Sequence, residues 1–200
     1  MKLEFRDPTV KVVKDSYKPN GDFSVSQPCT PIFDEQETLC GVTRPRQMTY
    51  IHSYGAEGQF FKGIAHGRLL GTRCDNPKCE GHGTVYLPFR TFCPDCLEKN
   101  TVVDLTDVAN KTARIHTCIV TSRTGAYNPL PTPIRFVDVE FDGVATILKG
   151  YMVGPGEPSI GMRVVPVFKT GAPTYEILDM AFAKEGVTQA ELPEGFTFSK

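Results

Sequence analysis

The sequence lacks an excess of positive charge. Its 22 Lys and Arg residues stand against 23 Asp and Glu residues, which leaves a net charge of −1. A dedicated nucleic-acid-binding protein normally carries a clustered basic excess, because neutralising phosphates supplies much of the affinity. The charge balance therefore counts against that class of protein.

Long apolar runs are also missing. No segment approaches the roughly 18–20 apolar residues that cross a bilayer, so we expect no membrane partner. The first residues, MKLEFRDPTVKVVK, are charged and have no apolar centre of the kind found in a signal peptide. We therefore expect a cytoplasmic protein, whose thiols stay reduced and free to bind metal.

Catalytic and nucleotide-binding motifs are absent as well. The sequence shows no phosphate loop, dinucleotide fingerprint or two-carboxylate constellation. The glycine-rich run 151–156 lacks the Lys and the helix that a phosphate cradle needs. His116 and Cys118 lie two apart in one expected strand, so they should point to the same face in parallel rather than toward each other. We assign no catalytic residue.

What the sequence does have is four cysteines in two pairs. Cys74 and Cys79 have four residues between them, Cys93 and Cys96 have two, and thirteen residues separate the pairs. Two thiolate pairs on a short hairpin form a tetrahedral cage that suits Zn²⁺. Because thiolate fills all four positions, we predict a structural zinc rather than a catalytic one. A ligand set with His82 in place of Cys79, four unrelated thiols, and disulfides are the alternatives.

Residues 1–53 are predicted to form an N-terminal extension. Proline dipeptides interrupt the segment, and its apolar residues follow no period that would make a core, although 10–13 favours a short strand. Such a segment usually lies on another surface, of its own chain or of a partner. Its Cys29 and Cys40 fit either isolated small apolar residues or additional ligands or redox thiols.

Residues 54–67 predict one short amphipathic helix. Phe60, Phe61 and Ile64 fall on one side, and Gly67 is a suitable C-terminal stop. A helix this short must pack on something. The three apolar side chains therefore either pack on the protein's own body or bind a partner subunit.

The remaining chain predicts a ribbon and then a barrel. We expect the helix and the ribbon to occupy residues 54–100. A five-stranded barrel of the OB type should follow at 101–185, and a polar tail at 186–200. Alternating residues and Gly-marked turns support the barrel, with an Asp142-Gly143 hairpin signal and with Pro166 at an edge or bulge. Strands are expected at 102–105, 113–122, 134–141, 144–152, 161–169 and 175–183. The fold class is mainly β: extension and short helix, rubredoxin-like zinc ribbon, then a five-stranded OB-fold barrel.

This order resembles the family of zinc-ribbon/OB-fold acyl-CoA-associated proteins. The resemblance covers about residues 54–183, apart from a first cysteine pair wider than the family's usual two-residue gap and an unusually long extension. It is carried by Gly67-Arg68-Leu69-Leu70, Pro88-x-Arg90-x-Phe92-Cys93-Pro94-x-Cys96, Phe141-Asp142-Gly143 and Gly161-Met162-x-Val164.

The resemblance implies a small accessory subunit without catalytic residues of its own. Family members pair with thiolase-like or ketosynthase-like acyl-CoA enzymes, and sometimes with hydratase-like or aldolase partners. We therefore expect a hetero-oligomer with a thiolase or acyltransferase that acts on a 3-oxoacyl-CoA. Arg68, Arg73 and Arg90 then either contact CoA phosphates at the interface or are general surface charge. A single-stranded nucleic-acid-binding module and an independent enzyme are the competing hypotheses.

Overall fold

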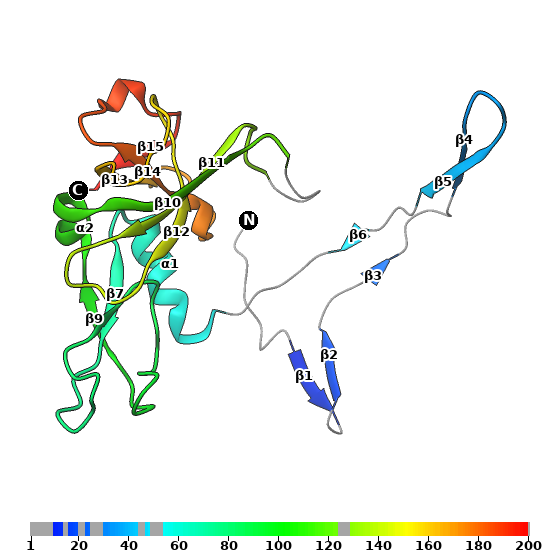
Figure 1. Cartoon of the computed structure of the whole chain (residues 1–200). Coiled ribbons are helices and arrows are strands. Elements are labelled where there is room, and N and C mark those ends of the chain that lie inside the picture. The colour runs from blue at the N-terminus through cyan, green and yellow to red at the C-terminus, as the bar shows by residue number, and fades with distance from the viewer. Residues whose placement is uncertain are drawn as a thin grey trace. The chain divides into compact units, whose positions relative to one another are not determined.

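The structure is a computed structural model that describes residues 10–13, 16–19, 23–24, 30–43, 47–48, 54–123 and 129–199. The described chain is mainly β, with short helices and several small antiparallel sheets, as predicted (Figure 1). It divides into two compact units, Met1–Gly55 and Ala56–Lys200. No helix of the described part is long and apolar enough to cross a membrane.

The described residues of the first unit form paired short strands. The strand expected at 10–13 is present as β1, and three two-stranded antiparallel sheets join β1 to β2, β3 to β6 and β4 to β5. The strands are β1 (Val10–Val13), β2 (Ser16–Pro19), β3 (Phe23–Ser24), β4 (Thr30–Phe33), β5 (Leu39–Thr43) and β6 (Gln47–Met48). Two-stranded ribbons of this length bury little surface.

The 3₁₀ turn η1 (Gly55–Glu57) leads into helix α1 (Gly58–Ala65), within the segment where a helix was predicted. Gly67 ends the helix as expected: its φ is 73°, and Arg68 N–H donates to Gly63 O at 3.0 Å. This left-handed termination satisfies carbonyls that the last helical turn would otherwise leave open.

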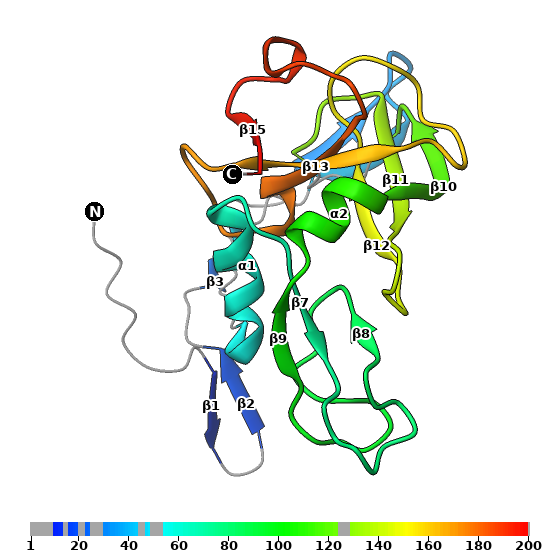
Figure 2. The same cartoon turned by 90° about the vertical axis from the view of Figure 1, so that its left-hand side faces the viewer.

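A three-stranded ribbon sheet follows α1. Its strands are β7 (Leu70–Arg73), β8 (Val85–Tyr86) and β9 (Thr101–Asp104), and β7 lies between the other two, antiparallel to both. In Figure 2 this sheet projects from the rest of the second unit, with the loops that join its strands at the far end. Helix α2 (Thr106–Thr112), which was not predicted, then leads into the barrel.

Five strands close the barrel in an order that defines its type. The strands are β10 (Arg114–Thr121), β11 (Ile134–Glu140), β12 (Leu148–Tyr151), β13 (Val164–Lys169) and β14 (Met180–Lys184). Antiparallel ladders give β10-β11-β12 and β14-β13, an antiparallel bridge joins Arg114 to Arg163, and a parallel bridge joins Met152 to Phe182. Counted within the barrel, the closed order is 1-2-3-5-4, with one parallel contact between the third and fifth strands. This is the predicted five-stranded OB-type Greek-key barrel.

Pro166 sits at a gap along one edge of β13. Val164 N–H donates to Ala113 O next to β10, and Phe168 pairs with Thr197 farther along the same edge. Pro166 lies between these two contacts, at a point where no described strand pairs with this side of β13. Its lack of an N–H therefore removes no ladder hydrogen bond. Because β13 is the middle strand of the sheet β14-β13-β15, Pro166 lies at a local gap in the pairing and not on an edge strand or at a bulge, as we had expected.

The C-terminal segment is structured where we expected a polar tail. Turns η2 (Ile177–Asp179) and η3 (Gln189–Glu191) flank β14, and β15 (Phe196–Phe198) adds to the free part of β13. Thr188 and Glu191 form a reciprocal capping box at η3. Buried Phe196 packs edge-on against Tyr151, with ring centroids 6.5 Å apart.

One apolar core joins the helix, the ribbon and the barrel. Buried residues of all three belong to a single cluster, including Phe60 and Ile64 of α1, Leu69, Leu87 and Phe89 of the ribbon, and Phe168 and Phe182 of the barrel. The base of the ribbon is therefore anchored in the barrel core, while its far end carries the four cysteines.

Candidate metal centre

The four predicted cysteines meet at the far end of the ribbon. Their Sγ atoms all lie within 4.8 Å of one another. Cys74 Sγ lies 3.9 Å from Cys96 Sγ, and Cys79 Sγ lies 3.8 Å from Cys93 Sγ. A tetrahedron of sulfurs around zinc at ~2.3 Å has edges of about 3.8 Å. The spacing therefore fits a metal ion at the centre of the group.

The wide first cysteine pair is accommodated by a local turn. Lys78 N–H donates to Asn76 Oδ1 at 2.9 Å, and Cys79 N–H donates to Asn76 O at 3.1 Å. Asn side chains stabilise such turns by mimicking backbone acceptors. Gly81 N–H then donates to Cys79 Sγ at 3.3 Å. The two extra residues form this turn and leave Cys79 within the group.

The second turn favours the thiolate form of Cys93. The backbone N–H of Cys96, which is the largest influence, and that of Asp95 lower the pKa of Cys93 to about 6, although burial opposes them. Leu97 adopts a φ of 59° and donates its N–H to Cys93 O at 3.0 Å, which closes the turn. Buried Tyr86 places its hydroxyl 3.8 Å from Cys93 Sγ.

At Cys79 and Cys74, burial outweighs the backbone hydrogen bonds that favour the thiolate. Burial, with the neighbouring thiols adding to it, raises the pKa of Cys79 to about 12, and burial also raises the pKa of Cys74. Several anionic sulfurs this close repel one another unless a cation lies between them. The donor set is therefore chemically suited to a thiophilic divalent ion such as Zn²⁺.

The remaining candidate ligands lie elsewhere. His82, the alternative to Cys79, is exposed and is not part of the group of four. Cys40 is exposed in β5, and Cys118 is half-buried in β10. Cys29 lies outside the described residues. Of the described residues, only the four predicted cysteines form a cluster of potential metal ligands.

The three residues predicted to bind a partner do not share one environment. Phe60 and Ile64 are 3% and 0% exposed in the protein's own core, whereas Phe61 is half-buried. Phe61 borders an apolar groove of about 280 Å³ between α1, the ribbon base and β12. The groove is lined by Glu57, Phe60, Phe61, Pro88, Phe89, Ile147, Leu148, Lys149 and Ile177. Sequence analysis missed Ile147, Lys149 and Ile177, because only the fold brings these distant segments together.

The three arginines predicted to meet CoA phosphates also differ. Arg68 pairs with Asp104 at 2.6 Å, and Arg73 pairs with Asp75 at 2.6 Å. Arg90 lies over the Tyr86 ring, with Cζ 5.8 Å from the centroid, and no described acidic side chain forms an ion pair with it. Among these arginines, Arg90 is therefore the one whose charge is not already compensated by a carboxylate.

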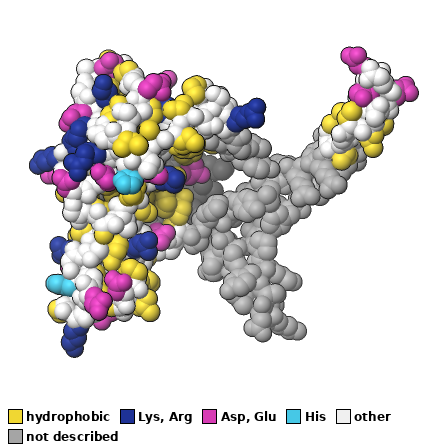
Figure 3. Space-filling view, viewed as in Figure 1, with side chains coloured by type: hydrophobic (Ala, Val, Ile, Leu, Met, Phe, Trp, Pro, Cys, Tyr) yellow, Lys and Arg dark blue, Asp and Glu magenta, His cyan; other side chains and the backbone are white. Residues whose placement is uncertain are grey.

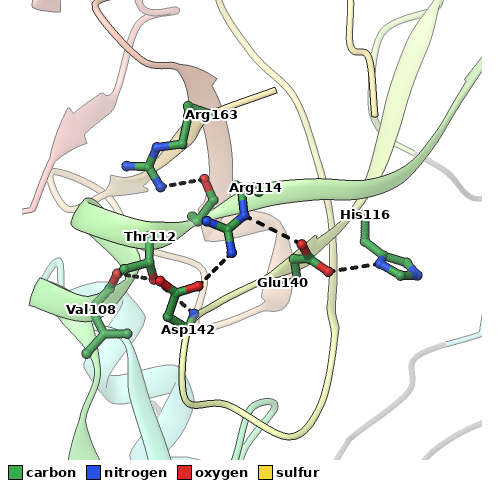
Figure 4. Close-up of polar contacts among 8 residues, drawn as sticks. Val108, Thr112, Arg114, His116, Glu140, Asp142 and Arg163 are labelled. Atoms are coloured by element: carbon green, nitrogen blue, oxygen red, sulfur yellow. Dashed lines mark hydrogen bonds and ion pairs between the residues drawn. The ribbon is translucent and has the colours of Figure 1, made fainter. Parts of the chain in front are cut away.

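His116 and Cys118 do not lie on the same face, contrary to our expectation. A register shift between Ile115 and Thr117 interrupts the alternation of β10. Cys118 packs against the core, whereas His116 is exposed and places Nδ1 3.0 Å from Glu140 Oε2. Figure 4 shows His116 and Arg114 on either side of Glu140, with Arg114 also reaching Asp142.

Comparison with known proteins gives similar structures only. No protein-family model and no curated protein matches the chain. A DUF35-family protein of unknown function from Sulfolobus solfataricus is 20% identical, with 64% of this chain and 83% of that chain covered and a TM-score of 0.45. The Ltp2-ChsH2(DUF35) aldolase is 22% identical, with 69% and 98% covered and a TM-score of 0.49. Both structures carry the DUF35 name, but at these values neither assigns an activity, partner or ligand to this chain.

Proposed function

We propose that this chain is a non-catalytic, zinc-binding accessory subunit of an acyl-CoA-processing enzyme, a thiolase or acyltransferase acting on a 3-oxoacyl-CoA. The observation that carries the proposal is the succession of α1, a four-cysteine ribbon and an OB-type barrel around one core. This is the order on which the resemblance to acyl-CoA-associated proteins rests. The subunit supports assembly of the enzyme or its binding of acyl-CoA.

The zinc has a structural role in this proposal. Cys74, Cys79, Cys93 and Cys96 would hold it, and four thiolates leave no position for a water or a substrate. The ion would compensate the sulfur charges and hold together the two turns at the far end of the ribbon. The sequence from Cys74 to Cys96 encloses β8, so the metal would also fix the path of the chain that leads back to the groove.

The groove beside α1 is the proposed contact for the partner. It is predominantly apolar, and Phe61 and Ile147 border it while remaining partly open to solvent. Exposed apolar surfaces of this kind commonly mark interaction sites. Phe60 lines the groove from the core and Ile64 is fully buried, so of the three predicted residues we keep Phe61 as the partner contact, together with its neighbours across the groove.

A native purification of the tagged full-length chain, followed by mass spectrometry and metal analysis, tests the proposal. We expect a thiolase-like or acyltransferase enzyme in fixed stoichiometry, with one zinc per copy of this chain. Phe61→Asp should weaken copurification, whereas Phe92→Asp, at a phenylalanine that is 58% exposed in the ribbon, is the matched control. A chain that recovers no acyl-CoA enzyme but retains single-stranded nucleic acid would overturn the proposal in favour of a nucleic-acid-binding module.

A further inference from the structure

The hairpin formed by β4 and β5 carries exposed apolar side chains. Every residue from 30 to 43 except Gly41 is exposed. Ile32, Phe33, Leu39 and Val42 are 48%, 56%, 63% and 46% exposed. A two-stranded hairpin is marginally stable in water by itself, and clustered exposed apolar side chains mark interaction sites.

The strand register sorts these side chains onto two different faces. Residues directly opposite each other in an antiparallel pair project to the same side, and successive residues alternate. A register shift between Ile32 and Phe33 leaves Cys40 as an extra residue in β5, while β4 itself alternates without interruption. Pro31 pairs with Val42 and Phe33 with Leu39, so these four apolar residues share one face. The other face carries Ile32 opposite Gly41 and Thr30 opposite Thr43, with the two threonines hydrogen-bonded at 3.1 Å. One face is therefore apolar throughout, and the other is mixed.

The tip of the hairpin is a fixed acidic turn. Asp34 Oδ1 accepts the N–H groups of Gln36 and Thr38 at 2.9 and 2.8 Å, and Asp34 N–H donates to Thr38 O at 3.0 Å. Glu35 and Glu37 lie within this turn. Residues 30–43 contain three acids and no Lys or Arg, which gives a net charge of −3. Figure 3 shows hydrophobic side chains along the hairpin and acidic ones at its tip.

We propose that the β4–β5 hairpin is a docking arm, whose apolar face enters an apolar groove rimmed by Lys or Arg on the partner enzyme subunit. The inference rests on the proposed function for the identity of the partner. Phe33 and Leu39 are the anchors, because they are the largest side chains of the apolar face. Glu35 and Glu37 face the basic rim, where complementary charge accelerates association and fixes orientation.

A second copy of this chain is a poorer occupant. The apolar groove beside α1 carries Glu57, and Lys149 on its rim is already paired with Asp138 at 3.1 Å. The one cation among the residues that line that groove is therefore already compensated. Two hairpins packed face to face would likewise bring together two segments of charge −3, with no Lys or Arg between them. A different protein with a basic rim matches both the apolar face and the charge.

Adjacent residues of β4 provide a matched test in the purified complex. Phe33→Asp and Ile32→Asp add the same charge to the same strand, at positions of similar exposure but on opposite faces. We expect Phe33→Asp to weaken the complex on the order of 30-fold, as for an interface anchor, and Ile32→Asp to have a much smaller effect. Equal loss with both variants, or no loss with Phe33→Asp, would overturn the docking-arm proposal.

Charge and accessibility give two further readouts. Glu35→Lys together with Glu37→Lys should slow association with the partner about 10-fold at low salt, and this difference should disappear at high salt.

Cys40 is exposed and adjoins Leu39, so its thiol should be alkylated quickly in the free chain and slowly in the complex, as measured by peptide mass spectrometry. Unchanged alkylation of Cys40 in a stable complex would count against the arm.

The same experiments separate the two proposals. If an acyl-CoA enzyme copurifies whether or not Phe33 is replaced, the proposed function stands and the docking arm falls. If a different protein is bound through Phe33 but not Ile32, the arm stands and the acyl-CoA function falls. If the free chain self-associates and only Phe33→Asp abolishes this, a second copy is the occupant and the proposed partner is wrong.

Discussion

Arg68 and Asp104 close the ribbon at the end opposite the four cysteines. Arg68 Nη2 lies 2.6 Å and Arg68 Nε lies 2.9 Å from Asp104 Oδ2. Arg68 precedes β7, and Asp104 ends β9. Asp104 Oδ1 also accepts the N–H and the hydroxyl of Thr106 at 3.0 and 2.5 Å. One carboxylate therefore joins the start of β7 and the end of β9 to the first turn of α2.

This arrangement predicts that Asp104 contributes to stability at neutral pH and loses its contribution in acid. Burial, the largest single influence, raises the pKa of Asp104, but hydrogen bonds from Thr106 and Arg68 outweigh it and lower the pKa below 3.8. A carboxylate whose pKa is lower in the folded protein than in the unfolded chain stabilises the fold fully when the pH is above the pKa of the unfolded chain. This stabilisation is lost as the pH falls through the pKa of the folded protein. Between about pH 5 and pH 3, the Tm of the wild type should therefore fall more than that of Asp104→Asn. Parallel Tm curves for the two proteins would contradict this role.

Close packing at Gly71 predicts that even a methyl group is harmful there. A Cβ at Gly71 would lie 2.8 Å from the backbone oxygen of Tyr86 and would also overlap the Leu105 side chain. We expect Gly71→Ala to reduce the free energy of unfolding by about 1–3 kcal/mol, as in other overpacked sites. Gly171→Ala is the control, because a Cβ there meets nothing within 4 Å. Urea unfolding of both variants measures the difference, and equal values would show that the ribbon accommodates the methyl group.

The metal ligands can be separated from their nearest competitor by single substitutions. Cys79→Ser should lower the zinc content of the purified protein and its Tm, whereas His82→Ala should leave one zinc per chain, because His82 lies outside the sulfur group. A chelator should lower the Tm of the wild type toward that of Cys79→Ser, since the folded ribbon binds the metal better than the unfolded chain does. Loss of zinc with His82→Ala and not with Cys79→Ser would support the alternative ligand set.

The barrel was predictable largely because its strands alternate. Ile134 to Glu140 follows the expected pattern, with Val137 and Val139 buried at 1% and 0% exposure. The start of β14 was misplaced: we expected 175, but the strand begins at Met180. Buried Asp179 accepts the N–H groups of Thr174 and Tyr175 at 2.7 and 2.6 Å, which holds the preceding residues in a loop. Side-chain-to-backbone bonds of this kind leave no periodic trace in a sequence.

Helix α2 and the groove were missing from the sequence prediction for different reasons. Helix α2 has seven residues and buries only Thr106 and Ala109, so it shows no apolar stripe. The groove brings together residues from α1, β12 and η2, and no sequence spacing encodes that arrangement. The four cysteines were predictable because both ligand pairs are local, and only the closure between the pairs depends on the fold.

The three arginines of the ribbon differ in how freely they could bind CoA phosphates in the proposed complex. Arg68 and Arg73 each hold a carboxylate at 2.6 Å, so binding a phosphate would require them to release it or share it. Arg90 has no such described ion pair and stacks on Tyr86. If this chain meets CoA phosphates, Arg90→Ala should weaken CoA binding by the complex about 10-fold, as expected for a charge-assisted hydrogen bond. Arg73→Ala, which removes the same charge from the same ribbon, should change CoA binding less.

The binding of CoA and of pantetheine, which lacks the phosphates of CoA, should be measured for both variants by calorimetry. A loss seen only with CoA assigns Arg90 to phosphate, whereas an equal loss with both ligands would mean that Arg90 acts on the shape of the interface. If Arg73→Ala causes the larger loss, ion pairing does not decide which arginine meets the phosphates.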